Sequence, residues 1–280
     1  MHSEQKRVLI PLAGYAASVT LHDCGDSAAP TLLALHGFGG SGKDFEQLRQ
    51  SFGRKVSWIC PDFMGHGESE SPDILDPYQL PAVLRLIDQA RALAPDPGKV
   101  LLLGYSMGGR LALHYLRHAT PMPALLIGIS PGLQEAGERA RRRQSDREWI
   151  QLMNGSMEQF CTKWEQQDLI HPQTLIEEPF RSHLASRRRR NSAVGLSNTL
   201  LASGTGVLTS LWTHLPRFPP LVLCYGSEDA KFGNIARKMQ VANSRFVVRE
   251  VPDSGHSPHL ENPVELASLI EVELDSLLYR

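Results

Sequence analysis

Cysteine is scarce in this chain of 280 residues, which has 4 scattered Cys residues. No C-x-x-C pair and no spacing typical of metal ligands occurs, so neither disulfide bonds nor a zinc site is expected. Cys60 and Cys224 lie inside apolar runs typical of strands. A small buried side chain is the natural interpretation of both.

An excess of charge of either sign is also lacking. The chain has 29 Lys and Arg against 30 Asp and Glu, a net charge of −1, and 41% of its residues are hydrophobic. This balance gives no reason to expect a nucleic-acid or membrane partner. It is ordinary for one globular enzyme domain of this length.

A clear secretory leader is missing as well. The stretch 8–19 follows two basic residues as the core of a signal peptide would, but Pro11 and Gly14 interrupt it. Alternating residues from 15 to 21 instead predict an opening strand. A cytoplasmic location is therefore expected.

The chain does contain a short motif with chemical meaning, Gly104-Tyr105-Ser106-Met107-Gly108. Four apolar residues precede it and helix-forming residues follow it. This pattern predicts a strand, a very tight turn and a helix, with Ser106 exposed at the start of the helix. The backbone N–H of Met107 would then donate to a developing oxyanion.

A reactive serine needs an imidazole and a carboxylate. Asp229 and His256 each follow a strand-like run later in the chain. The order Ser106, Asp229, His256, each on a loop after a strand, resembles that of the α/β-hydrolases and predicts a catalytic triad. The alternatives are Glu228 and Asp253 as carboxylate and His259 as base.

A glycine-rich loop, His36-Gly37-Phe38-Gly39-Gly40, follows an earlier strand-like run. The N–H of Phe38 is the predicted second donor of the oxyanion hole. The loop also matches the G-x-G-x-x-G of dinucleotide-binding proteins, with Asp62 as the ribose-binding acid, but that interpretation leaves the triad unexplained. A P-loop is disfavoured because Asp44 stands where Ser or Thr is needed.

The strand signals stop at about residue 129 and resume at 219. Between them, residues 132–218 are polar, helix-patterned and rich in Arg, and we expect a helical lid inserted over the carboxyl ends of the strands. Residues 1–131 and 219–280 would form the core. The expected fold class is α/β, with a mostly parallel central sheet flanked by helices.

Arginines gather in two clusters of the predicted lid, 138–147 and 187–190. Each could be a solvated helix face, and a nucleic-acid patch would lack interleaved aromatic residues. Arg110 lies on the helix that leaves Ser106, one turn further on, where the helix dipole disfavours a cation. It therefore needs an anion, from the protein or from a polyanionic substrate.

Several segments together resemble one known family, the 2-succinyl-6-hydroxy-2,4-cyclohexadiene-1-carboxylate (SHCHC) synthases of menaquinone and phylloquinone biosynthesis. The resemblance runs from about residue 33 to the last helix. Its discriminating parts are Arg110, the Arg-x-x-Ser-Asp-Arg run at 142–147 and Gly204-Thr205-Gly206. The other matching segments are residues 36–41, 104–109, 130–133 and 226–232.

The resemblance implies a cofactor-free lyase that eliminates pyruvate from an enolpyruvyl cyclohexene bearing three carboxylates. Ser106, deprotonated through His256 and Asp229, would remove a ring proton as a base. The positions carried over as substrate contacts are Tyr105, Arg110, Arg142, Trp164 and, from the run 187–190, Arg190.

Two further functions fit the same motifs. A serine hydrolase acting on an ester or a carbon–carbon bond would use the same triad, and a binding module would use the pocket alone. A roof of arginines favours an anionic substrate, whereas a roof of Leu and Phe favours a neutral ester. The sequence makes no prediction of the oligomeric state.

Overall fold

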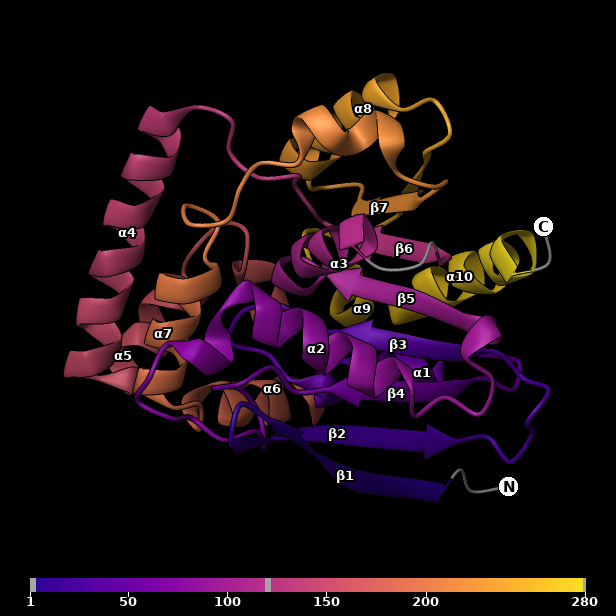
Figure 1. Ribbon diagram of the computed structural model, residues 1–280, viewed down its shortest axis with the longest axis horizontal. Helices are drawn as coiled ribbons and strands as arrows, with labels where there is room; N and C mark the ends of the chain where they lie inside the picture. The colour runs from indigo at the N-terminus through magenta and orange to yellow at the C-terminus, as the bar shows by residue number, and fades with distance from the viewer. Residues whose placement is uncertain (1–3, 119–121, 279–280) are drawn as a thin grey trace.

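An eight-stranded sheet forms the centre of the computed structural model, which describes residues 4–118 and 122–278 (Figure 1). The strand order is β1-β2-β4-β3-β5-β6-β7-β8. β2 runs antiparallel to both neighbours, and all pairs from β4 to β8 are parallel. The strands are β1 (Glu4–Leu12), β2 (Tyr15–Asp23), β3 (Thr31–Leu35), β4 (Ser57–Pro61), β5 (Val100–Tyr105), β6 (Ala124–Ile127), β7 (Val222–Gly226) and β8 (Val247–Val251).

The central strands coincide with the apolar runs of the sequence. Every residue of β3, β5, β6 and β7 is buried, as expected for parallel strands covered on both faces. Successive side chains of β5 alternate between two cores, with Leu102 in one and Leu101 and Leu103 in the other. The predicted mostly parallel sheet is confirmed.

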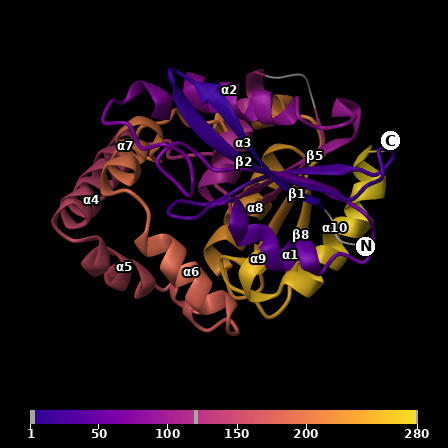
Figure 2. The same ribbon diagram turned by 90° about the horizontal axis from the view of Figure 1, so that it is seen from below.

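Helices cover both faces of the sheet (Figure 2). α2, α3 and α8 contribute to one hydrophobic core, and α1 and α10 contribute to the other. The helices and turns of this part are η1 (Gly42–Phe45), α1 (Glu46–Gln50), η2 (Asp76–Tyr78), α2 (Leu80–Arg91), η3 (Pro97–Lys99), α3 (Met107–His118), α8 (Ala230–Ala242), α9 (Pro258–Glu261) and α10 (Pro263–Leu278).

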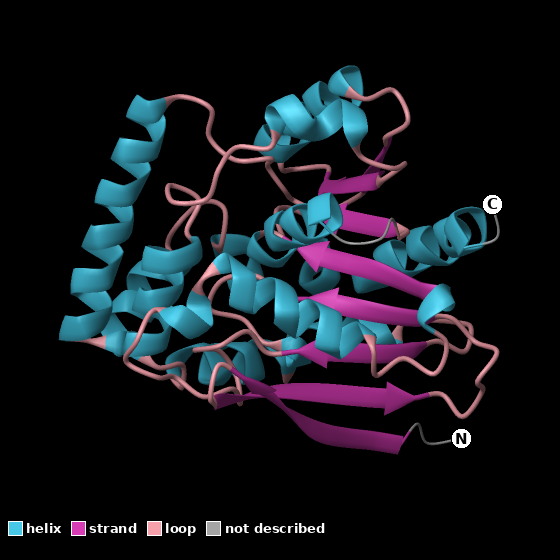
Figure 3. Cartoon of the chain, in the orientation of Figure 1, coloured by secondary structure: helices cyan, strands magenta, loops and turns pink. Residues whose placement is uncertain are grey.

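Residues 132–218, which we call the α4–α7 segment, connect β6 to β7 and are helical without a strand. Most of the segment lies beyond the carboxyl ends of the parallel strands, on the side to which their arrowheads point (Figure 3), whereas Leu211, Leu215 and Phe218 near its end pack in the core that α8 shares. That residues 132–218 form an inserted lid on a core of residues 1–131 and 219–280 stays a prediction. Its elements are α4 (Ala136–Gly155), α5 (Met157–Glu165), η4 (His171–Thr174), α6 (Phe180–Arg189), α7 (Ala193–Ser203) and η5 (Trp212–Arg217).

The sequence did not predict β1, which pairs with β2 in a hairpin from Glu4↔Asp23 to Leu12↔Tyr15. Of the two residues that interrupt the apolar run, Pro11 lies within β1, and Gly14 forms the turn together with Ala13, with φ of 87° and 53°. Two successive positive φ angles are typical of the tight turns that match strand twist. None of the helices over residues 4–118 and 122–278 is both long and apolar enough to cross a membrane.

Candidate active site

Ser106 stands at the sharp turn between β5 and α3 with a φ of 49°, a left-handed conformation that is costly for a side chain bearing a Cβ. Small neighbours make the turn possible. A Cβ on Gly104 would lie 2.6 Å from the Cα of Gly109, and a Cβ on Gly108 would lie 2.6 Å from the carbonyl oxygen of His36. The strained serine is thus held by backbones that only glycine allows to approach.

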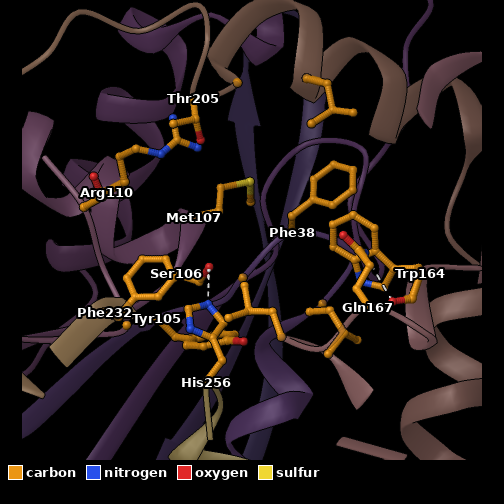
Figure 4. Close-up of a pocket in the computed structure, with 18 of the residues that line it drawn as sticks. Phe38, Tyr105, Ser106, Met107, Arg110, Trp164, Gln167, Thr205, Phe232 and His256 are labelled. Carbon is orange, nitrogen blue, oxygen red and sulfur yellow. Dashed lines mark hydrogen bonds between the residues drawn. The ribbon is translucent and has the colours of Figure 1, made fainter. Parts of the chain in front are cut away.

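The structure brings the three residues of the predicted triad together. The His256 Nε2 lies 3.1 Å from the Ser106 Oγ (Figure 4). The His256 Nδ1 lies 2.8 Å from the Asp229 Oδ2. Because a carboxylate accepts only, Nδ1 carries the proton and Nε2 is free to take the serine proton. Asp229 and His256 are both buried, which shields their hydrogen bond from water.

The alternative triad residues lie elsewhere. Glu228 and Asp253 are exposed. His259 packs on Tyr105 with ring centroids 4.2 Å apart, and burial lowers its pKa to about 3. A histidine that stays neutral to such acidity is a poor proton acceptor at neutral pH.

The two predicted oxyanion residues, Phe38 and Met107, both line the cavity at Ser106. The loop of Phe38 is fixed from behind by His36, whose Nδ1 lies 2.7 Å from the Gly37 carbonyl oxygen while its Nε2 accepts from the Phe63 N–H. Burial lowers the pKa of His36, which favours this neutral form. Rigid donors of this kind stabilise a negative oxygen without reorganising.

Asp62 does not point to a ribose site. Its two carboxylate oxygens accept from the backbone N–H groups of Gly42, at 2.7 Å, and Glu68, at 2.8 Å. Asp62 therefore ties the glycine-rich loop to the turn after β4. This local role accounts for the residue that suggested dinucleotide binding.

A cavity of about 380 Å³ lies between the strand ends and the α4–α7 segment. One wall is aromatic: the rings of Phe38 and Trp164 have centroids 5.3 Å apart (Figure 4). The ring centroid of Trp149 lies 5.3 Å from that of Trp164. Trp164, predicted as a substrate contact, therefore reaches the cavity that holds Ser106. Within the described residues, no group of three or more His, Cys, Asp and Glu could hold a metal ion.

Arg110 reaches the opposite wall of this cavity (Figure 4). Its guanidinium is buried and donates to the carbonyl oxygen of Ser203 at 3.0 Å. Burial, followed by the nearby charge of Arg142, lowers the pKa of Arg110 to about 10, while Asp146 acts in the opposite direction. Arg142 itself lines the cavity and pairs with Asp146 at 2.8 Å. Among the described residues, Arg110 forms no ion pair within 4.0 Å of its own.

Arg190 does not reach the cavity, contrary to expectation. It is exposed at the C-cap of α6, whereas Arg188 is 5% exposed and lines the cavity. The reason is helical periodicity, since Arg188 lies four residues after buried Leu184 and therefore on the same face. That spacing is present in the sequence and could have identified Arg188.

Tyr105, the remaining predicted substrate contact, lines the cavity, and its hydroxyl lies 2.6 Å from the Ser257 Oγ. Burial raises the pKa of Tyr105, so it stays neutral. Gln173, which sequence reasoning missed, lies in η4 and donates to Ser257. A single glutamine in a polar segment gives no sequence signal that it will be buried beside the cavity.

Comparison with known proteins agrees with this geometry. A model described as "Alpha/beta hydrolase family" matches residues 32–269. A Salmonella enteritidis SHCHC synthase is 31% identical over 247 residues, 86% of this chain and 92% of that protein. A Bacillus subtilis protein, whose name gives the same activity provisionally, is 32% identical over 263 residues, 91% of this chain and 94% of its own. This chain belongs to the SHCHC synthase family of α/β hydrolases.

Solved structures show the same fold. MenH from S. aureus superposes with a TM-score of 0.83 at 25% identity, covering 94% of this chain and 99% of the other. An esterase from Exiguobacterium antarcticum gives a TM-score of 0.78 at 17% identity, covering 98% of this chain and 100% of the other, a likeness of fold alone. The predicted α/β-hydrolase fold and the family resemblance are both confirmed.

Proposed function

We propose that this SHCHC synthase family member is a carbon–oxygen lyase of menaquinone biosynthesis. It would eliminate pyruvate from 2-succinyl-5-enolpyruvyl-6-hydroxy-3-cyclohexene-1-carboxylate to give SHCHC. The names of its relatives, which give SHCHC as the compound that they make, support this product. The same proposal includes a cytoplasmic reaction with a small polycarboxylate substrate, without cofactor, metal, nucleic acid or membrane.

In this reaction Ser106 acts as a base. Its proton passes to His256, held by Asp229, and the serine oxygen removes the ring proton beside the succinyl ketone. The electron pair moves through the ring double bond, forms the diene and breaks the carbon–oxygen bond to enolpyruvate, which leaves and becomes pyruvate. The N–H groups of Phe38 and Met107 would stabilise the negative charge that develops on the ketone oxygen.

The observation that carries the proposal is Arg110, a buried cation beside Ser106 without an ion-pair partner among the described residues. A bound carboxylate would supply the missing anion. Arg142 and Arg188 also line the cavity, so three guanidinium groups face a substrate with three carboxylates. In this proposal Arg188 has the carboxylate-binding role that was predicted for Arg190.

The test mixes purified protein with the enolpyruvyl substrate and measures pyruvate release, with Ser106→Ala as the control. We expect rapid release by the wild type and a loss of several powers of ten in the variant. Intact mass measured during turnover should show no adduct, since a base forms no bond to carbon.

A serine hydrolase remains the second candidate, because the aromatic wall of Phe38, Trp149 and Trp164 would also suit a neutral acyl group. A panel of simple esters measured beside the tricarboxylate separates the two. Ester turnover with a burst and an acyl adduct on Ser106, without pyruvate release, would replace the lyase proposal.

A further inference from the structure

A buried chain of hydrogen bonds joins the α4–α7 segment to the loops that carry Ser106 and His256, and Gln173 stands at its centre. Gln173 is 4% exposed. Its Oε1 accepts from the Arg188 Nη2 at 2.6 Å. Its Nε2 donates to the Ser257 Oγ at 2.6 Å and to the Tyr105 hydroxyl at 3.4 Å. One amide therefore connects Arg188 with the direct chain neighbours of two triad residues.

The orientation of this amide follows from its partners. A guanidinium only donates, so the Gln173 oxygen must face Arg188 and its nitrogen must face Ser257 and Tyr105. The oxygen and both amide protons are then engaged within the protein. Gln173 borders the cavity but has no proton left for a ligand.

Arg188 keeps a charge that a ligand can use. Its Nη1 lies 3.3 Å from Glu165, but the same carboxylate oxygen also lies 3.5 Å from Arg189. The Arg188 Nε is buried without a hydrogen-bond partner among the described residues. One shared carboxylate thus compensates only part of the positive charge of Arg188, which lines the cavity.

We propose that Gln173 is a positioning residue that sets the Arg188 guanidinium relative to Ser106 and His256. A neutral amide at this place fixes the cation without neutralising it. A carboxylate there would form a second ion pair and remove the charge that attracts an anionic group. This inference rests on the proposed function, because it assigns to Arg188 the binding of one substrate carboxylate.

Gln173→Glu tests this idea because it keeps the shape of the side chain and changes only its charge and its donors. Gln166→Glu is the matched control, since it adds the same charge at an exposed position at the end of α5. Arg188→Met and the double variant Gln173→Glu/Arg188→Met complete a cycle that shows whether Gln173 acts through Arg188.

Pyruvate release gives the first measurement. We expect Gln173→Glu to raise KM at least tenfold and to change kcat less than threefold, whereas Gln166→Glu should match the wild type. In the Arg188→Met background, Gln173→Glu should have less than a twofold further effect on KM. A tenfold fall of kcat with an unchanged KM would overturn the proposal. So would a tenfold rise of KM caused by Gln173→Glu in the Arg188→Met background.

A second measurement does not depend on the natural reaction. Fluorophosphonates label reactive serines: the Ser106 oxygen bonds to phosphorus, fluoride leaves, and the serine proton goes to His256. Labelling rates are compared for a neutral reagent and for reagents with a carboxylate on chains of graded length. The best carboxylate reagent should exceed the neutral one in the wild type, and Gln173→Glu should lower that ratio at least tenfold.

These two measurements separate the two hypotheses. An altered labelling ratio without pyruvate release by the wild type would reject the lyase and keep the role of Gln173. Pyruvate release with an unchanged ratio would keep the lyase and reject the role of Gln173. The role of Gln173 would also be rejected if the wild type reacted no faster with any carboxylate reagent than with the neutral one, or reacted with none of the reagents.

Discussion

Arg110 carries a charge that the folded protein surrounds with few compensating groups. Its donation to the Ser203 carbonyl satisfies one N–H, while burial and Arg142 both disfavour the charged form. Asp146 favours the charged form but forms no ion pair with Arg110, and a buried cation that is only partly compensated costs stability. A protein tolerates such a cost where the charge serves binding. Removing the charge of Arg110 should therefore lower activity without lowering stability.

The first prediction concerns Arg110→Met, which removes the charge and keeps most of the side-chain volume. A charge-assisted contact to a substrate carboxylate contributes about 1.5–3 kcal/mol, so kcat/KM for pyruvate release should fall at least tenfold. The melting temperature should not fall. Arg110→Lys should recover only part of the activity, because an ammonium lacks the planar fork.

Steady-state kinetics and thermal melts of the same preparations check this prediction. The exposed Arg190 provides the matched control, since Arg190→Met should leave kcat/KM unchanged. Full activity of a folded Arg110→Met protein would show that the cation does not face the substrate, and the hydrolase would then be the better proposal.

At the level of elements, the turn between β5 and α3 allows a sharp prediction for Gly108→Ala. The added Cβ would contact the Leu35 carbonyl oxygen and lie 2.6 Å from that of His36, and both are backbone atoms that cannot swing away. We expect a loss of stability of about 2 kcal/mol or more, as for overpacked cores, together with loss of activity because Ser106 shifts. Urea unfolding measures the first effect.

Gly155→Ala is the control for this change. Gly155 is also helical, at the end of α4, and a Cβ there would meet nothing within 4 Å. This variant should be neutral or slightly more stable, because it lowers the entropy of the unfolded chain. Equal destabilisation by both alanines would mean that close backbone approach does not hold the turn.

The sequence predicted those features of the fold and the site that depend on residues close together in the chain. The run Gly104 to Gly108 predicted the turn at Ser106, because the glycine requirement acts within a few residues. The buried parallel strands appear as continuous apolar runs, since both faces are covered. Features that depend on distant residues were harder to predict. β1 was missed because Pro11 and the turn at Gly14 interrupt its apolar run. Gln173 was missed because its role depends on hydrogen bonds to three residues that are distant in the sequence.

At the scale of the whole molecule, buried neutral histidines set the response to acid. Burial lowers the pKa of His66 to about 3, of His114 to about 4 and of His259 to about 3, from 6.5. Below pH 6.5 these histidines bind protons in the unfolded chain but stay neutral in the folded protein. Their contribution to stability is therefore fully present above pH 6.5 and is lost as the pH falls toward 4. Burial also raises the pKa of Asp62 and Glu261, and these carboxyls act in the opposite direction.

The last prediction follows from this imbalance. Below pH 6.5, each of the three histidines lowers the free energy of unfolding by about 1.4 kcal/mol per pH unit, and the three together lower it by about 4 kcal/mol per pH unit. A typical domain has only about 5–15 kcal/mol of stability. The free energy of unfolding, measured in urea, should therefore fall steeply from pH 7 to pH 5. His259→Phe should reduce that slope by about one proton, because a phenyl ring can keep the contact with Tyr105 but cannot titrate. His183→Gln, at an exposed position, should leave the slope as it is. If His259→Phe leaves the slope between pH 7 and pH 5 unchanged, the His259 ring titrates alike in the folded and the unfolded protein, and the neutral environment assigned to it would be wrong.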